Sequence, residues 1–302
     1  MAGVDKTILQ LGSDLMELTA QVTRLSQVKE ASRSACQRIR FGSEFCMYNL
    51  PTIEEIKTAH KITTDAVKEF VYVTPRLADS AMDKVRQQLI LLNNLGSNTV
   101  VANDLGTLRI IRRLPNLKPH LGRQLVYTPS RCPWKQITEQ SVNILAKKKL
   151  EQIFYQTNLN YEPTINFFKD MGVVGVDVDW IPQLFKNLSL LQQNQLKVSV
   201  HLQTIPVAIT RKCHTARFHG EGDLEHCSKR CGKDAYSMEN DILKTSLLLH
   251  GNVVFRNMEP KRTDVRELAQ SGVTELVITM SPITTILSKA QLDDLIQHIQ
   301  EL

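Results

Sequence analysis

EFVYVTPRLADSAMDKVRQQLIL, residues 69–91, contains the structural unit from which we expect the whole chain to be built. Its start is apolar and predicts a buried strand over Glu69–Val73. The polar turn Thr74–Arg76 ends this strand, and an amphipathic helix is expected to run on to Leu91. A strand, a polar turn and a helix in this order are typical of α/β proteins.

The same succession recurs in both directions along the chain. We predict strands at Thr7–Leu11, Gln37–Phe41, Glu69–Val73, Asn98–Ala102, Arg123–Tyr127, Val173–Val178, Lys197–Gln203, Asn252–Arg256 and Val273–Met280. One helix is predicted over 15–28, after an N-cap at Ser13, and the next begins at Ile53. Two more follow the strands at Glu69–Val73 and Asn98–Ala102 and end at Leu91 and at about Arg113. The others are predicted over Gln136–Glu151, Pro163–Met171, Ile181–Gln192, Thr263–Ser271 and Lys289–Glu301.

Roughly eight such units without a glycine-rich dinucleotide loop favour a TIM-like (β/α) barrel over a doubly wound sheet. We expect one barrel domain over residues 1–302, because no strong linker interrupts the pattern. Residues 128–157 do not fit the alternation and are predicted to form an insertion or a lid.

The composition is that of an ordinary globular protein. Of 302 residues, 42% are hydrophobic and 23% charged, which supports a full core. The net charge of +6 comes from scattered Lys and Arg, so it permits an acidic partner such as nucleic acid without requiring one. No apolar run approaches the roughly 18 residues of a membrane span, and the first residues do not have the pattern of a secretory signal. We therefore expect a cytoplasmic protein with reduced thiols.

The stretch IPVAITRKCHTARFHGEGDLEHCSKRCG, residues 205–232, carries the most distinctive chemistry. Cys213, Cys227 and Cys231 fall within it, and its many polar residues argue against a core strand or helix. On a helical turn, Cys227 and Cys231 would share one face. Soft thiolates select zinc, Cu(I) or iron–sulfur clusters. Because the ligands are spread out, they favour an iron–sulfur cluster over a single zinc ion, while a radical-SAM motif is absent.

A fourth ligand has to come from elsewhere in the chain. Cys46 is favoured, because it follows a predicted strand and would lie at the barrel mouth; Cys132, within SRCPW, is the competitor. Cys36 precedes its strand, and we expect it to be a buried apolar thiol. We expect the nearby histidines His214, His219 and His226 to be exposed or to lie outside the ligand set.

Other polar residues also follow predicted strands, so they are expected to gather at the mouth. They are Thr74, Asn103, Asp104, Asp179 and Gln203. Asp104 and Asp179 are also suited to cap the next helices. The catalytic candidates are Glu44, Asp177 and Arg217, and we expect Asp177 to point into the barrel. Arg217, together with Arg211 and Lys212, is suited to hold an anionic substrate or to offset the negative charge of a thiolate cluster. No Ser–His–Asp order or G-x-S-x-G motif suggests hydrolysis.

Several residues and motifs of the chain form a distinctive set. They are Pro206, Ala208, Cys213, Thr215, Ala216, Arg217, Cys227 and Cys231, with FGSEFC (41–46), ANDLG (102–106) and a late strand that ends in Ser281–Pro282. In this set the chain resembles UbiV-like proteins of the collagenase-like (U-type) peptidase family. The loop Cys213–Cys227 is one residue longer than expected for this family, and 128–157 has no counterpart.

The resemblance implies a barrel with a 4Fe–4S cluster on Cys46, Cys213, Cys227 and Cys231. It further implies an oxygen-independent hydroxylase of the ubiquinone precursor ring, acting as a heterodimer with a UbiU-like family member and with a lipid-binding accessory protein. Other members of the family hydroxylate RNA bases. Two alternatives therefore stay open, an RNA-base hydroxylase and a non-catalytic subunit in which the cluster carries electrons or stabilises the structure. Peptidase activity is implied only by the family name.

Overall fold

The computed structural model describes residues 16–132, 140, 143–185, 188–239, 241, 246–258, 268 and 270–301. Eight parallel strands in these ranges close into a barrel in the order β1-β12-β7-β6-β5-β4-β3-β2. They are β1 (Glu17–Val22), β2 (Arg38–Gly42), β3 (Glu69–Val73), β4 (Asn98–Ala102), β5 (Leu117–Leu121), β6 (Gly175–Asp179), β7 (Lys197–His201) and β12 (Glu275–Thr279). The predicted TIM-like (β/α) barrel is confirmed.

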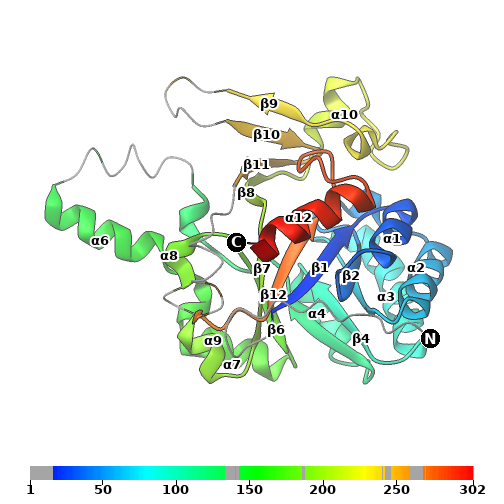
Figure 1. The fold of residues 1–302 in the computed structure, drawn as a ribbon, viewed down its shortest axis with the longest axis horizontal. Helices are drawn as coiled ribbons and strands as arrows, with labels where there is room; N and C mark the ends of the chain where they lie inside the picture. Colours follow the sequence, from blue (N-terminus) through cyan, green and yellow to red (C-terminus); the bar gives the residue numbers. More distant parts are fainter. Residues whose placement is uncertain are drawn as a thin grey trace.

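Helices between these strands cover the outside of the barrel (Figure 1). They are α1 (Leu25–Ser32), α2 (Ile53–Asp65), α3 (Asp79–Asn94), α4 (Leu105–Ile111), α7 (Glu162–Asp170), α8 (Pro182–Phe185), α9 (Ser189–Gln193) and α12 (Lys289–Glu301). In the predicted insertion, η2 (Pro129–Arg131) precedes α6 (Ile144–Phe154), which projects away from the barrel in Figure 1. The core lies between strands and helices, where Ile39, Phe41 and Leu89 are buried.

A second sheet of four antiparallel strands lies between β7 and β12 in the chain and across one end of the barrel (Figure 1). Its order is β8 (Thr204–Ile209), β11 (Val253–Asn257), β10 (Leu247–His250) and β9 (Tyr236–Met238). Because β7 ends just before β8, this sheet lies at the carboxyl ends of the barrel strands. The expectation that 205–232 contains no core strand is wrong at its start, since Ile205 in β8 is fully buried.

The prediction of a helix over residues 15–28 is also wrong, because β1 occupies Glu17–Val22. Leu18 and Val22 are four residues apart, a spacing that puts two side chains on one face of either a helix or a strand. The intervening Thr19 is buried as well, so both faces of the strand are covered and no polar alternation marks it. The strand predicted at Thr7–Leu11 lies outside the described residues.

The fifth strand is displaced from its prediction, since β5 is Leu117–Leu121 and not Arg123–Tyr127. Pro119 hides it in the sequence, because proline is rare inside sheets. Similarly, the helix expected over Ile181–Gln192 is divided into α8 and α9. Most of the helix predicted at Thr263–Ser271 lies outside the described residues.

Charged side chains fill much of the barrel interior. Arg40 Nη1 donates to both Asp177 carboxylate oxygens at 2.8 and 2.9 Å, and its Nη2 donates to Glu275 Oε2 at 2.8 Å. His120 Nε2 lies 2.9 Å from Asp177 Oδ1, and His201 Nε2 lies 3.2 Å from Oδ2. All five residues are at most 3% exposed, so these charges depend on one another and not on water.

This network predicts a loss of stability in acid. Burial raises the pKa of Glu275, but Arg40 and Arg38 outweigh it and lower that pKa to about 2. Because the folded pKa lies below the ordinary value of 4.5, the stabilisation is complete above 4.5 and is lost as the pH falls towards about 2. We expect the free energy of unfolding, measured with urea, to fall over this range, and less steeply in Glu275→Gln. Glu54→Gln, at an exposed site, serves as the control and should leave the slope unchanged. An equal slope in wild type and Glu275→Gln would contradict the prediction.

Candidate functional site

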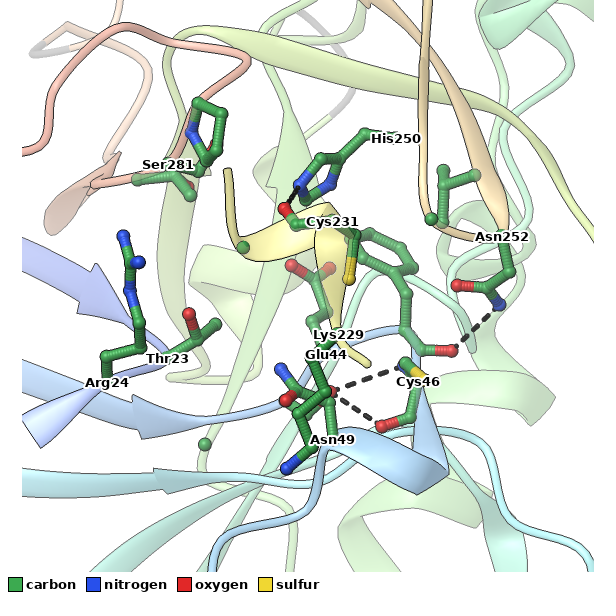
Figure 2. Close-up of a pocket in the computed structure, with 18 of the residues that line it drawn as sticks. Thr23, Arg24, Glu44, Cys46, Asn49, Lys229, Cys231, His250, Asn252 and Ser281 are labelled. Carbon is green, nitrogen blue, oxygen red and sulfur yellow. Dashed lines mark hydrogen bonds between the residues drawn. The ribbon is translucent and has the colours of Figure 1, made fainter. Parts of the chain in front are cut away.

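Four cysteines line one cavity between the barrel end and the second sheet. Cys46, Cys213, Cys227 and Cys231 border this space of about 370 Å³, and all six cysteines of the chain are free thiols. Figure 2 shows Cys46 and Cys231 in this cavity, with Glu44 nearby. The structure thus brings one early cysteine to the three late ones.

The late cysteines occupy irregular backbone after β8. Cys213 is the N-cap of α10 (His214–Phe218), and its Sγ accepts a hydrogen bond from the backbone N–H of Ala216 at 3.4 Å. The Cys227 sulfur accepts from the backbone N–H of Lys229 at 3.3 Å. Lys229 has a left-handed φ of 54°, so Cys227 and Cys231 are not joined by a helical turn on which they would share one face. Cys231 lies instead in η4 (Arg230–Gly232).

The four thiols are close enough to influence one another. Burial is the main effect, and Cys46, Cys213 and Cys227 add to it, so that the pKa of Cys231 is raised to about 12. Burial also raises the pKa of Cys46, with Cys213 and Cys227 again contributing. Four thiolates gathered here would therefore need a positively charged group between them.

No three His, Cys, Asp or Glu side chains among the described residues are arranged closely enough to hold a single metal ion. A tetrahedral zinc ion requires Zn–S distances of about 2.3 Å, which brings its four sulfurs together tightly. A cluster of several irons holds its thiolates further apart, because each sulfur binds a different iron. The four cysteines share one cavity.

The loop that carries Cys46 is held by several contacts. Ser43 Oγ donates to the Cys46 carbonyl at 2.7 Å and accepts from the Cys46 N–H at 3.3 Å. Asn252 Nδ2, in the turn between β10 and β11, donates to the Phe45 carbonyl at 3.1 Å (Figure 2). The Phe45 ring packs edge-on against Phe255 with centroids 5.4 Å apart. These contacts fix the Cys46 loop against the second sheet.

Arg123 lines the cavity, although nothing in the sequence marks it as a site residue. Its Nε and Nη2 each donate to Glu44 at 2.9 Å, and its Nη1 donates to Asp179 at 3.1 Å. Gln21 Nε2 adds a bond of 2.8 Å to Glu44. Burial raises the pKa of Glu44, but Arg123 outweighs it, and the net pKa is lowered. The position of Arg123 after a strand could not be recognised, because the fifth strand is predicted at Arg123–Tyr127 whereas β5 ends at Leu121.

The cavity walls are largely apolar, with a few charged side chains among them. Phe45, Leu50, Phe255, Met280 and Ile283 supply apolar surface. Arg24, Lys229 and Lys233 line it as well, and none of them pairs with a carboxylate in the ranges that the structure covers. His250 lies beside the cysteines, with its Nε2 2.5 Å from the Cys231 carbonyl oxygen. Such a space suits a ring with polar or anionic substituents.

The three catalytic candidates are not brought together. Glu44 lines the cavity, whereas Asp177 points into the barrel as predicted and is bound by Arg40. Arg217 is exposed on α10 and does not line the cavity. Arg211 borders a second cavity of about 500 Å³, which also touches Cys46 and Cys213.

The other polar residues expected at the mouth have structural partners. Asp104 caps α4, with Oδ1 accepting from Gly106 N–H at 2.7 Å, as predicted. Asp179 does not cap a helix in this way; it binds Arg123 and Arg131. The remaining three, Thr74, Asn103 and Gln203, bond to backbone groups of neighbouring loops and strands.

The remaining two cysteines and the three histidines near the late cysteines lie outside the cavity. Cys36 is 1% exposed, as expected for a buried thiol. Cys132 does not line the cavity and lies close enough to Arg256 to affect its pKa. None of His214, His219 and His226 lines the cavity; His226, with an 84% exposed side chain, pairs with Asp223.

Neither a family model nor a curated protein matches this chain. Among solved structures, it is similar to the U32 peptidase Mk0906, with 13% identity over 89% of this chain and 94% of that chain and a TM-score of 0.46. It is also similar to a truncated 3-deoxy-D-arabino-heptulosonate 7-phosphate synthase from Thermotoga maritima (9% identity, 98% and 91% covered, TM-score 0.45). A third similar structure is orotidine 5'-monophosphate decarboxylase from Sulfolobus solfataricus (10% identity, 95% and 100% covered, TM-score 0.40). These likenesses concern the fold alone.

Among the described residues, no helix is both long enough and apolar enough to cross a bilayer.

Proposed function

We propose that this protein is the iron–sulfur subunit of an oxygen-independent hydroxylase that acts on the ring of a ubiquinone precursor. The observation that carries the proposal is the meeting of Cys46 with Cys213, Cys227 and Cys231 around one cavity. The proposed cofactor is a 4Fe–4S cluster with these four thiolates as its ligands, and it would supply one-electron redox chemistry beside the cavity.

The residues present fit such a cluster. Backbone N–H groups already point at the Cys213 and Cys227 sulfurs, and hydrogen bonds to thiolate sulfur are one of the means by which proteins tune cluster potentials. The four thiols are free, and all of them line the same cavity, which supports this assignment. Cys132 is left out, because it does not line the cavity.

The cavity supports a ring as substrate. Its aromatic and aliphatic walls, including Phe45, Phe255 and Ile283, would hold the ring, and the cations that line it would receive polar substituents. The proposal includes a UbiU-like family member as heterodimer partner and a lipid-binding accessory protein, both of which rest on the sequence resemblance.

One observation favours a second candidate function, a non-catalytic electron carrier. Glu44 and Asp177, the carboxylates suited to proton transfer, are both neutralised by buried arginines. Four thiolates also complete the coordination of a cubane, so no iron would be open to a substrate. In this alternative the subunit would pass electrons to its partner.

Anaerobic purification followed by iron and sulfide analysis tests the cluster. We expect about four irons and four sulfides per chain in the wild type, their loss in Cys46→Ala, and retention in the matched variant Cys132→Ala. Zinc or no metal in the folded wild type would refute the proposal, and loss in Cys132→Ala would refute the ligand set. Ring hydroxylation without oxygen by the loaded protein with its partner would support the hydroxylase. Reversible reduction of the cluster without product would favour the electron carrier.

A further inference from the structure

We propose that Arg123 is a positioning residue that holds Cys46 in register with the other three cysteines, an inference that rests on the proposed cluster. The cysteine set is divided between two parts of the chain. Cys46 follows β2 of the barrel, whereas Cys213, Cys227 and Cys231 follow β8 of the second sheet. A cluster bound by both parts is only as rigid as the contacts that join them.

Arg123 contacts two consecutive residues of the loop that carries Cys46, Glu44 and Phe45. Two hydrogen bonds of 2.9 Å tie its Nε and Nη2 to the Glu44 carboxylate. Its guanidinium carbon also lies 5.6 Å from the centroid of the Phe45 ring. The next residue, Gln124, donates to the Glu44 carbonyl. Glu44 and Phe45, the two residues before Cys46, are therefore held by side chains of the segment after β5.

The remaining nitrogen of the Arg123 guanidinium, Nη1, contacts the second sheet. Nη1 donates to the carbonyl of Thr204, the first residue of β8, at 2.7 Å, and to Asp179 Oδ1 at 3.1 Å. β8 leads directly to Cys213. The Arg123 side chain thus joins the loop of Cys46 to the strand that leads to the other three cysteines. It is 1% exposed, so water does not compete for these hydrogen bonds.

The geometry requires arginine. A guanidinium presents donors in a flat fork, which here serves Glu44 on one side and Thr204 with Asp179 on the other. A lysine would keep the positive charge but would have a single nitrogen to share among these acceptors. Arg123→Lys therefore removes the alignment while it preserves the net charge of the site.

A loosened Cys46 would make its iron the easiest to lose. Oxidation of a 4Fe–4S cluster in the 2+ state by one electron, with ferricyanide as the acceptor, gives the 3+ state. Loss of the iron bound by Cys46 as Fe²⁺ then leaves a 3Fe–4S cluster of charge 1+. This three-iron product is paramagnetic, and the 4Fe–4S cluster in the 2+ state is not, so EPR reports the conversion without any assay of activity.

The test measures this conversion in anaerobically purified, cluster-loaded protein treated with ferricyanide. We expect Arg123→Lys to form the three-iron signal roughly tenfold faster than the wild type, because each lost hydrogen bond to a charged group is worth a change on this scale. Glu44→Gln leaves the bonds of Arg123 to Thr204 and Asp179 in place and is expected to show a smaller acceleration. It also keeps the test available if Arg123→Lys does not fold.

Arg38→Lys is the matched control. Arg38 also carries several carboxylate contacts, to Glu17, Glu69 and Glu275, but it lies at the start of β2 and does not line the cavity of the four cysteines. Wild-type rates in both Arg123→Lys and Glu44→Gln would overturn the proposal, as would equal acceleration in Arg38→Lys. A wild type without iron and sulfide would instead remove the proposed function, and iron analysis before the oxidant is added distinguishes that result.

Discussion

Arg40→Met is expected to lower the free energy of unfolding by roughly 3–5 kcal/mol, the usual effect of removing one partner from a buried ion pair. Arg40 neutralises Asp177 and Glu275, and neither carboxylate can reach water in the folded protein. Burial lowers the pKa of Arg40, but these two carboxylates outweigh it and raise the pKa above its ordinary value. Without Arg40, Asp177 keeps only His120 and His201 as partners, and Glu275 keeps Arg38 at 3.5 Å. Both buried acids therefore lose their closest cation or take up protons. Urea unfolding at neutral pH measures the change.

An exposed pair of the same length provides the control for Arg40→Met. Lys57 Nζ lies 2.8 Å from Glu54 Oε1, and both side chains are largely exposed. Lys57→Met should change the free energy of unfolding by less than about 0.5 kcal/mol, because solvent screens the pair. Adding Asp177→Asn to Arg40→Met should recover part of the loss. Similar changes in Arg40→Met and Lys57→Met would contradict the importance of the interior network.

Gly42→Ala is expected to cost roughly 4 kcal/mol and to lower the iron content of the purified protein. Gly42 has a φ of +142°, and a Cβ there would lie 2.1 Å from the carbonyl oxygen of Val73 on the neighbouring strand. Because that oxygen belongs to the barrel backbone, Gly42 itself would have to move. Gly42 is the last residue of β2 and directly precedes the loop to Cys46, so the displacement would reach the proposed ligand. Denaturant unfolding and iron analysis of the same preparation measure both effects.

Gly96→Ala separates the two causes of strain. Gly96 also has a positive φ, +115°, but no atom lies within 4 Å of its added Cβ. Only the backbone strain then remains, which we expect to cost about 1–2 kcal/mol, with no change in iron content. If Gly42→Ala behaves like Gly96→Ala, the close contact with Val73 has no effect on the Cys46 loop.

The barrel could be predicted from the sequence because the alternation of strands and helices is visible in short stretches of the chain. The strand at Glu69–Val73, the next at Asn98–Ala102 and the last helix, Lys289–Glu301, were predicted with their observed bounds. Errors occurred where local signals conflict, such as Pro119 inside β5 and the four-residue spacing in β1. Cysteine chemistry and position after a strand also directed attention to Cys46.

Only the tertiary structure revealed what surrounds the cysteines. The carboxylate of Glu44 reads in the sequence as a catalytic candidate, yet in the fold it is held by Arg123, 79 residues away. Arg40 and Glu275 are 235 residues apart, and their pairing depends on closure of the barrel. Hydrophobic periodicity reports which face of an element is buried, because it depends on near neighbours in the chain. It carries no information on which distant charges meet, since that is decided by strand order, register and closure.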